Sequence, residues 1–153
     1  MTDRIDVVRR SWNMSRVRSF DTRPELEVRR LVHRLGYRFR LHRRTLPGTP
    51  DLVFPCLRAV IFVHGCFWHR HAGCSKASTP ATRPDFWAKK FETNQRRDEK
   101  VKQALLSDGW NVEVIWECEV RDKNALSRRL TAFLQPLKAT VKIRKGASIP
   151  NSA

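Results

Sequence analysis

The chain has no long run of apolar residues. Its longest, "AVIFV" at 59–63, has five residues, whereas roughly 20 are needed to span a bilayer. The first residues, "MTDRIDVVRRSW", also lack the apolar stretch of a secretory signal. The sequence therefore predicts neither a membrane protein nor an exported one, and we expect an intracellular location.

Acidic residues are scarce. Fifteen Asp and Glu stand against 31 Lys and Arg, which gives a net charge of +16 and a pI near 11.0. Such a balance indicates a polyanionic partner. Solubility or an anionic membrane would also account for charge alone, but together with five tryptophans it favours nucleic acid. The four cysteines of an intracellular protein are more typical of metal ligands than of disulfides.

No internal repeat is evident, and 153 residues correspond to one domain. Residues 1–20 are polar and arginine-rich without a lasting period, which predicts a flexible basic arm that orders on its partner. Residues 138–153 are read as a flexible basic tail in the same way. The folded domain is expected at 21–137.

Three helices are predicted inside that domain. The first has Thr22 as N-cap, Pro24 in the first turn, Glu25 completing a capping box, and Gly36 after its end. A long charged helix follows "ATRPDFW" and closes at Gly109. The last, within 122–137, has one apolar stripe, formed by Leu126, Leu130, Phe133, Leu134 and Leu137.

Four strands are predicted between and after these helices. Residues 37–42 alternate strictly, 51–54 and 59–63 form a hairpin around "PCLR", and "WNVEVIW" at 110–116 is the last strand. The order is helix, three strands, helix, strand, helix. It predicts an α/β sandwich, a mixed central sheet flanked by helices.

One short segment, "VHGCFWHRHAGC" at 63–74, concentrates candidate ligands. Cys66, His71 and Cys74 could present three donors to one tetrahedral zinc, and Cys118, just beyond a strand, could be the fourth. The alternative is a set of reduced thiols and a surface histidine. Four protein ligands would make a closed, structural site. Cys56 is read as an ordinary thiol.

The same segment leaves two histidines over, His64 and His69. A loop ordered by metal would hold them rigidly, as general acid/base or phosphate-contacting groups require, although a lone histidine is usually structural. Asp51 begins a strand that the hairpin brings beside His64. A carboxylate there could hold Mg²⁺ against a phosphate; the alternative is a turn aspartate that caps its own backbone.

Five segments resemble one family: "RSWNMSRVRSFDTRPE", "LPGTPDLVF", "VIFVHGCFWHRHAGC", "PATRPDFW" and "WECEV". They are similar to the very short patch repair (Vsr) mismatch endonucleases, bacterial enzymes with a restriction-endonuclease-like, PD-(D/E)XK-like fold, over roughly residues 8–135. The resemblance implies a strand-specific endonuclease. It would nick 5′ of the thymine in a T·G mismatch that arises from 5-methylcytosine deamination, and so initiate very short patch repair.

The resemblance also assigns roles to residues. Asp51 would be the principal ligand of catalytic Mg²⁺, two ions being expected, together with the backbone carbonyl of Val63. His69 would be the general base, and His64 would lie at the scissile phosphate. Glu25 would lie near this active site, although its capping box explains it locally.

The chain departs from the wider fold at one motif. An acid-x-Lys motif is usual on the strand after the Asp, whereas this chain has "VHG" at 63–65. Proton handling is then expected to pass to histidine. The resemblance makes the zinc structural, one ion bound by Cys66, His71, Cys74 and Cys118.

Four apolar residues are expected to contact DNA: Met14, Phe67, Trp68 and Trp87. In the family, aromatic residues at these loop and helix positions wedge into the base stack; core packing is the alternative. Phe86 is expected in the core.

The expected partners are duplex DNA with a T·G mismatch and, in later repair, mismatch-repair proteins and a repair polymerase. A single asymmetric nick favours a monomer, located in the bacterial cytoplasm at the nucleoid. Two rival hypotheses are a zinc-stabilised DNA-binding module without catalysis and a related nuclease for another mismatch or lesion.

Overall fold

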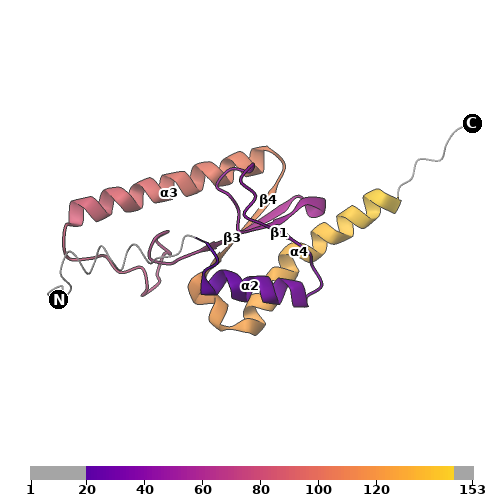
Figure 1. Cartoon of the computed structure of the whole chain (residues 1–153), viewed down its shortest axis with the longest axis horizontal. Coiled ribbons are helices and arrows are strands. Elements are labelled where there is room, and N and C mark those ends of the chain that lie inside the picture. Colours follow the sequence, from indigo (N-terminus) through magenta and orange to yellow (C-terminus); the bar gives the residue numbers. More distant parts are fainter. Residues whose placement is uncertain (1–19, 147–153) are drawn as a thin grey trace, which may run out of the picture.

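The computed structural model describes residues 20–146 (Figure 1). The element order is the predicted one: helix, three strands, helix, strand, helix. The helices are α2 (Arg23–Arg34), α3 (Pro84–Ser107) and α4 (Lys123–Gly146), and the strands are β1 (Arg40–Leu41), β2 (Leu52–Phe54), β3 (Ala59–His64) and β4 (Asn111–Trp116). Two short 3-10 turns, η1 (Pro55–Leu57) and η2 (Glu117–Arg121), follow β2 and β4. Within residues 20–146, no helix combines the length and apolarity that a membrane crossing requires.

The four strands form one mixed sheet in the order β1-β2-β3-β4. The predicted hairpin is confirmed, with β2 antiparallel to β3 around η1. β3 then pairs in parallel with β4, with Val63 opposite Ile115 and His64 opposite Trp116. The carboxyl ends of β3 and β4 therefore meet at the same edge, which brings the loop after β3 beside η2.

The first strand is shorter than the predicted 37–42. Only Arg40 and Leu41 pair, because β2 offers just three residues before Pro55, which has no N–H for the ladder. Tyr37 and Phe39 nevertheless pack against the core. The alternating pattern was correct for Tyr37 and Phe39 and wrong at its end, because Leu41 is 43% exposed and His42 is half-buried.

Helices cover both faces of the sheet (Figure 1). Because strand side chains alternate between faces, β2 and β3 supply two separate cores. The larger lies against α2 and α4, and its largest fully buried members include Phe54, Ile61, Leu126 and Leu130. The smaller contains Val53, Val60 and Phe62, packed with Leu105 of α3 and Trp110. The flanked mixed sheet that the sequence predicted is confirmed.

Two details correct the sequence-based expectations. α4 continues through Gly146 with Pro136 inside it, so residues 138–146, expected in the tail, are helical. Side chains beyond Leu137 are mostly exposed, so no apolar stripe marks this part of the helix. Phe86, expected in the core, is 46% exposed because it lies in the first turn of α3, whose neighbour Trp87 turns inward instead.

Candidate active site and metal centre

Asp51 lies immediately before β2, after the turn at 46–50. Its Oδ2 accepts a hydrogen bond from the Val63 backbone N at 2.7 Å, which ties it to the neighbouring strand. Burial raises the pKa of Asp51 to about 7, against the effect of this hydrogen bond, and the nearby Glu25 carboxylate adds to the rise. A buried carboxylate of this kind is stabilised when a cation joins it.

Glu25 projects from the first turn of α2 toward the same place. The predicted capping box is confirmed on its Thr22 side, where Thr22 Oγ1 accepts from Glu25 N at 3.4 Å. The carboxylate itself is only 2% exposed as a residue and lies 3.3 Å from His42 Nε2. That nitrogen is 3.9 Å from Asp51 Oδ1. Glu25 therefore combines its capping role with a place beside Asp51.

His42 was missed by sequence reasoning. The alternation at 37–42 grouped it with Arg38 and Arg40 on the polar side. Its backbone, however, adopts a left-handed φ of 44°, and the chain turns there. The only sign of this in the sequence is that the apolar/polar alternation stops at His42, before "LPGTP".

His64 and His69 come together although one ends β3 and the other lies in the loop that follows. Their rings stack at 3.8 Å with 7° between planes. Burial, together with the adjacent His69, lowers the pKa of His64 to about 4. His64 is therefore neutral at physiological pH.

Asp98 of α3 bonds His69, with Oδ2 at 2.6 Å from Nδ1. This contact favours the tautomer with hydrogen on Nδ1, so that Nε2 is the proton acceptor. Asp98 was not predicted as a site residue, because within "RRDEK" nothing distinguishes it from a solvated helical charge. Only the fold shows that α3 crosses above the loop.

The four predicted zinc ligands form a single cluster. Donor atoms of Cys66, His71, Cys74 and Cys118 lie within 4.8 Å of one another. His71 Nδ1 is 3.6 Å from Cys66 Sγ and 3.3 Å from Cys118 Sγ. The usual Zn–S and Zn–N bond lengths at tetrahedral angles separate such donors by about 3.6 Å. The residues present therefore fit a tetrahedral metal with soft ligands.

The surroundings of this cluster also suit a metal. Cys66 directly follows β3 and Cys118 lies in η2 after β4, so the parallel pair delivers both. The His71 ring stacks on Trp116 at 4.4 Å, which fixes its orientation. Burial raises the pKa of the Cys66 thiol to about 12, and a bound cation would be needed to keep it as thiolate.

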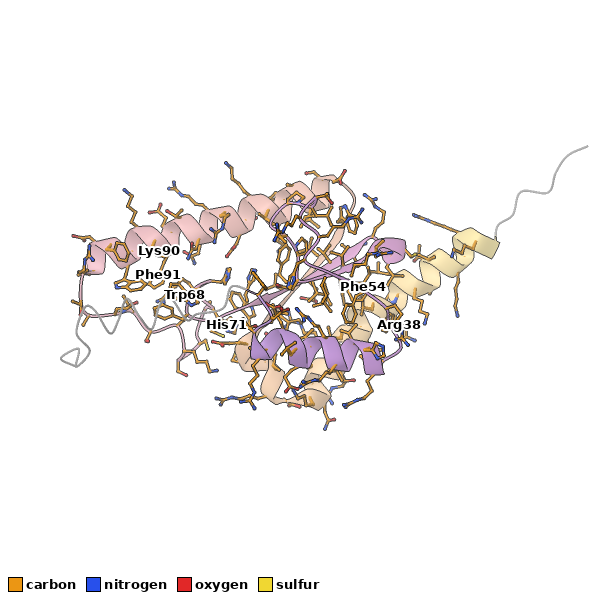
Figure 2. All side chains as sticks on the ribbon, viewed as in Figure 1. Arg38, Phe54, Trp68, His71, Lys90 and Phe91 are labelled. Atoms are coloured by element: carbon orange, nitrogen blue, oxygen red, sulfur yellow. The ribbon has the colours of Figure 1, made fainter. Side chains whose placement is uncertain are left out.

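The predicted DNA-contacting aromatics gather between this loop and α3. Phe67 lies 5.0 Å from Trp68 and 5.7 Å from Trp87, and 5.3 Å from Phe91. Trp68 and Phe91 are visible between the loop and the helix in Figure 2. Trp87 is largely buried at 9% exposure, whereas Phe67 and Trp68 are half-buried. Met14, the remaining predicted contact, lies outside the described residues.

One cleft of about 1440 Å³ unites these groups. The acidic and histidine residues that line it include Glu25, His42, Asp51, His64, His69 and Asp98. Trp68 and His71 reach it from the loop, and basic side chains are contributed by Arg44, Lys90, Arg97 and Lys102. A carboxylate, an oriented imidazole and surrounding positive charge are the parts that hydrolysis of a phosphodiester requires.

Comparison with known proteins gives matches along almost the whole chain. The family model described as DNA mismatch endonuclease Vsr matches residues 2–76. The type II nicking enzyme V.XorIIP of Xanthomonas oryzae pv. oryzae is 54% identical over 136 residues, 89% of this chain and 99% of the relative. The DNA mismatch endonuclease Vsr of Escherichia coli K12 is 40% identical over 127 residues, 83% of this chain and 81% of the relative. The type II nicking enzyme V.NmeAIP of Neisseria meningitidis is 36% identical over 141 residues, 92% and 100% of the two chains.

Proposed function

The chain belongs to the Vsr family of endonucleases, and on that premise we propose that it nicks duplex DNA 5′ of the thymine in a T·G mismatch. The nick would initiate very short patch repair after deamination of 5-methylcytosine. The names of the relatives support nicking and mismatch recognition, since they describe nicking enzymes and a mismatch endonuclease. Resynthesis would then require a repair polymerase and mismatch-repair proteins at the nucleoid.

The observation that carries the proposal is the pairing of Asp51 with the His69–Asp98 dyad across one cleft. Asp51 and the backbone carbonyl of Val63 would hold Mg²⁺, which neutralises phosphate charge when bound. His69 Nε2 would take the proton of the attacking water while Asp98 holds the ring. His64, uncharged and stacked on His69, would contact the scissile phosphate.

The missing acid-x-Lys motif is compensated within the same cleft. Glu25 brings a second carboxylate from α2 rather than from the strand after Asp51. The acid beside β2, the neighbouring β3 and helices on both faces of the sheet support a restriction-endonuclease-like fold. We propose that Glu25 takes part through the water around the catalytic ions, of which two are expected.

The thiol–imidazole cluster is proposed to hold one structural zinc. Bound there, the ion would join the loop after β3 to η2 through Cys66 and Cys118. His69 lies between ligands of this cluster in sequence, and His64 lies two residues before the first of them, Cys66. The zinc frame would thereby fix both histidines of the catalytic site.

The aromatic group is proposed to recognise the mismatch. Phe67, Trp68 and Trp87 would insert beside the mispair, where apolar side chains unstack base steps. A T·G pair costs less to open than a matched pair, so insertion selects it. Trp87 is buried in the DNA-free protein, so its insertion requires the cluster to rearrange. Basic residues along the cleft, Arg44, Lys90, Arg97 and Lys102, would fix register through phosphates.

The test uses purified protein, Mg²⁺ and labelled duplexes with T·G, other mismatches or matched pairs in several sequence contexts. One nick 5′ of the mismatched thymine, absent with Asp51→Ala, is the expected result. Cleavage of another mismatch or of abasic DNA instead would replace the substrate assignment. Binding without any cleavage would favour a zinc-stabilised binding module. A single nick by a protein of monomer mass would agree with the proposed monomer.

A further inference from the structure

Beside Asp51 lies a second group of potential metal donors. Ligand atoms of Asp21, Glu25 and His42 all fall within 4.8 Å of one another. Two carboxylates and an imidazole are donors that divalent transition metals accept. The group also opens on the same cleft, since Glu25 and His42 line it with Asp51. By composition alone, it would be a candidate for a cation site.

The positively charged guanidinium of Arg29 already lies among these three side chains. Arg29 follows Glu25 by one turn of α2, and its Nη2 lies 2.6 Å from Asp21 Oδ1 and 3.1 Å from Glu25 Oε2. The same atom is 3.4 Å from His42 Nε2. One nitrogen of Arg29 therefore contacts all three donors. Its side chain is only 13% exposed, whereas the Asp21 side chain that it contacts is 49% exposed.

The contacts of Arg29 indicate that electrostatic attraction, rather than a bidentate pair of hydrogen bonds, holds its side chain there. Its Nε is buried and has no hydrogen-bond partner among the described residues. A bidentate arginine would normally use Nε or both terminal nitrogens on one carboxylate. Here Nη2 alone lies among the donors. Because a guanidinium does not lose its proton in proteins, this positive charge is permanent.

We propose that Arg29 is a built-in cation that fills the Asp21–Glu25–His42 donor set and thereby confines divalent ions to the Asp51 side of the cleft. The proposal rests on the proposed function only in taking Asp51 as the metal ligand. Arg29 acts as a positioning residue, because it holds the Glu25 carboxylate at His42 and beside Asp51. Displacing it would leave the Glu25 carboxylate and the His42 imidazole without this positive charge, and His42 would become available as a metal ligand.

Mn²⁺ binding to the DNA-free protein tests this directly. Electron paramagnetic resonance counts bound Mn²⁺, and its electron spin-echo modulation detects coordination by an imidazole nitrogen. We expect Arg29→Gln and Arg29→Met to bind Mn²⁺ at least about 10-fold more tightly than the unmodified protein, since a positive charge a few ångströms away is removed. The new site should show nitrogen coupling that disappears when His42→Asn is added.

Two variants serve as controls. Arg29→Lys keeps a positive charge and should gain no nitrogen-coupled site. Arg30→Ala removes the next arginine of α2, which is exposed and paired with Glu27 outside the group, and should behave like the unmodified protein. Thermal unfolding of each variant identifies those that fold, and two neutral replacements of different shape are used so that one misfolded variant does not end the test.

Two results would overturn the proposal. One is His42-dependent nitrogen coupling of Mn²⁺ in the unmodified protein, which would make the group a metal site despite Arg29. The other is the absence of such coupling in folded Arg29→Gln and Arg29→Met. Neither readout depends on cleavage, so a protein that binds Mn²⁺ as expected but nicks no T·G duplex would refute only the proposed function.

Discussion

Two groups of donors in this protein meet the same distance criterion and differ in what lies among them. The thiol–imidazole cluster (Cys66, His71, Cys74, Cys118) and the carboxylate cluster (Asp21, Glu25, His42) each have ligand atoms within 4.8 Å of one another. Within the described residues, no arginine or lysine side chain is bonded to the first cluster, whereas Arg29 contacts every donor of the second. Proximity of donors therefore indicates a metal site only where the chain does not supply the cation itself.

The largest effect is expected when a thiol of the thiol–imidazole cluster is removed. Cys118→Ser should abolish zinc binding and lower the free energy of unfolding by about 5 kcal/mol or more, since structural zinc contributes folding free energy directly. Nicking should be lost as well, because His64 and His69 lie on the loop that the metal would fix. Zinc content and thermal unfolding measure the effect.

The matched control for that variant is Cys56→Ser. Cys56 is an exposed thiol in η1, away from the cluster, and its replacement should leave zinc content, stability and nicking unchanged. If Cys118→Ser retained full zinc and full stability, the cluster would not be a structural zinc site.

Replacing Asp51, which lies beside the carboxylate cluster, should have opposite effects on function and stability. Asp51→Asn should reduce nicking at least about 100-fold, because a carboxylate ligand is lost. Without Mg²⁺, however, it should raise the free energy of unfolding by about 1 to 3 kcal/mol at pH 8, since an ionised buried carboxylate is removed. Chemical denaturation of both proteins measures the difference.

The sign of the pH dependence follows from the direction of the pKa shift. Asp51 has its pKa raised from 3.8 to about 7 on folding. Its contribution to stability is therefore fully present below pH 4 and is lost as the pH rises through about 7. The advantage of Asp51→Asn should be large at pH 8 and small at pH 4.5. If the gain in free energy of unfolding from Asp51→Asn did not change with pH, the pKa of Asp51 would not be raised by burial.

A smaller effect is expected at the third donor group, His64, His69 and Asp98. Asp98→Asn keeps the size of the side chain but no longer favours hydrogen on His69 Nδ1. We expect kcat to fall roughly 10- to 1,000-fold with little change in KM for DNA. Glu92→Gln, an exposed change on the same helix, is the control. If Asp98→Asn and Glu92→Gln lowered kcat equally, the His69–Asp98 pair would have no specific role in catalysis.

Much of this arrangement could be predicted from the sequence, and for identifiable reasons. Thr22, Pro24 and Gly36 bound α2 because capping and turn chemistry are local, and the leucine stripe defined the buried face of α4. Cys66, His71 and Cys74 were evident from spacing within one loop. Cys118 was named from its place after a strand, and the parallel β3–β4 pair is what brings it to the cluster.

Two of the residues that sequence reasoning missed, Asp98 and His42, depend on contacts between distant elements. Asp98 meets His69 only because α3 crosses the loop, and His42 reaches Glu25 only because the chain turns at a left-handed residue. Arg29 was one of many arginines until its three partners were brought together. A basic composition hides such a residue, since one buried guanidinium has no mark in a sequence with 31 Lys and Arg.

The smallest predicted effect concerns Arg70, which lies in the loop between Cys66 and His71. Its guanidinium donates to the backbone carbonyls of residues 67, 77 and 78 and lies 4.0 Å above the Phe91 ring. Because none of these partners is a metal donor, Arg70→Ala should leave zinc content unchanged. It should lower the free energy of unfolding by about 1 to 3 kcal/mol and speed hydrogen exchange in the loop at 75–80.

Arg70 and Arg29 differ in their relation to the two clusters, and the zinc content of Arg70→Ala tests that difference. Arg96→Ala, an exposed change on α3, should alter neither stability nor zinc content and provides the reference for Arg70→Ala. Loss of zinc from Arg70→Ala would mean that the loop cannot hold the metal without its arginine, and the cation would then be part of both clusters. If Arg70→Ala kept its zinc but had a more mobile loop, Arg70 would support a metal site from outside, whereas Arg29 would take the place of a metal ion.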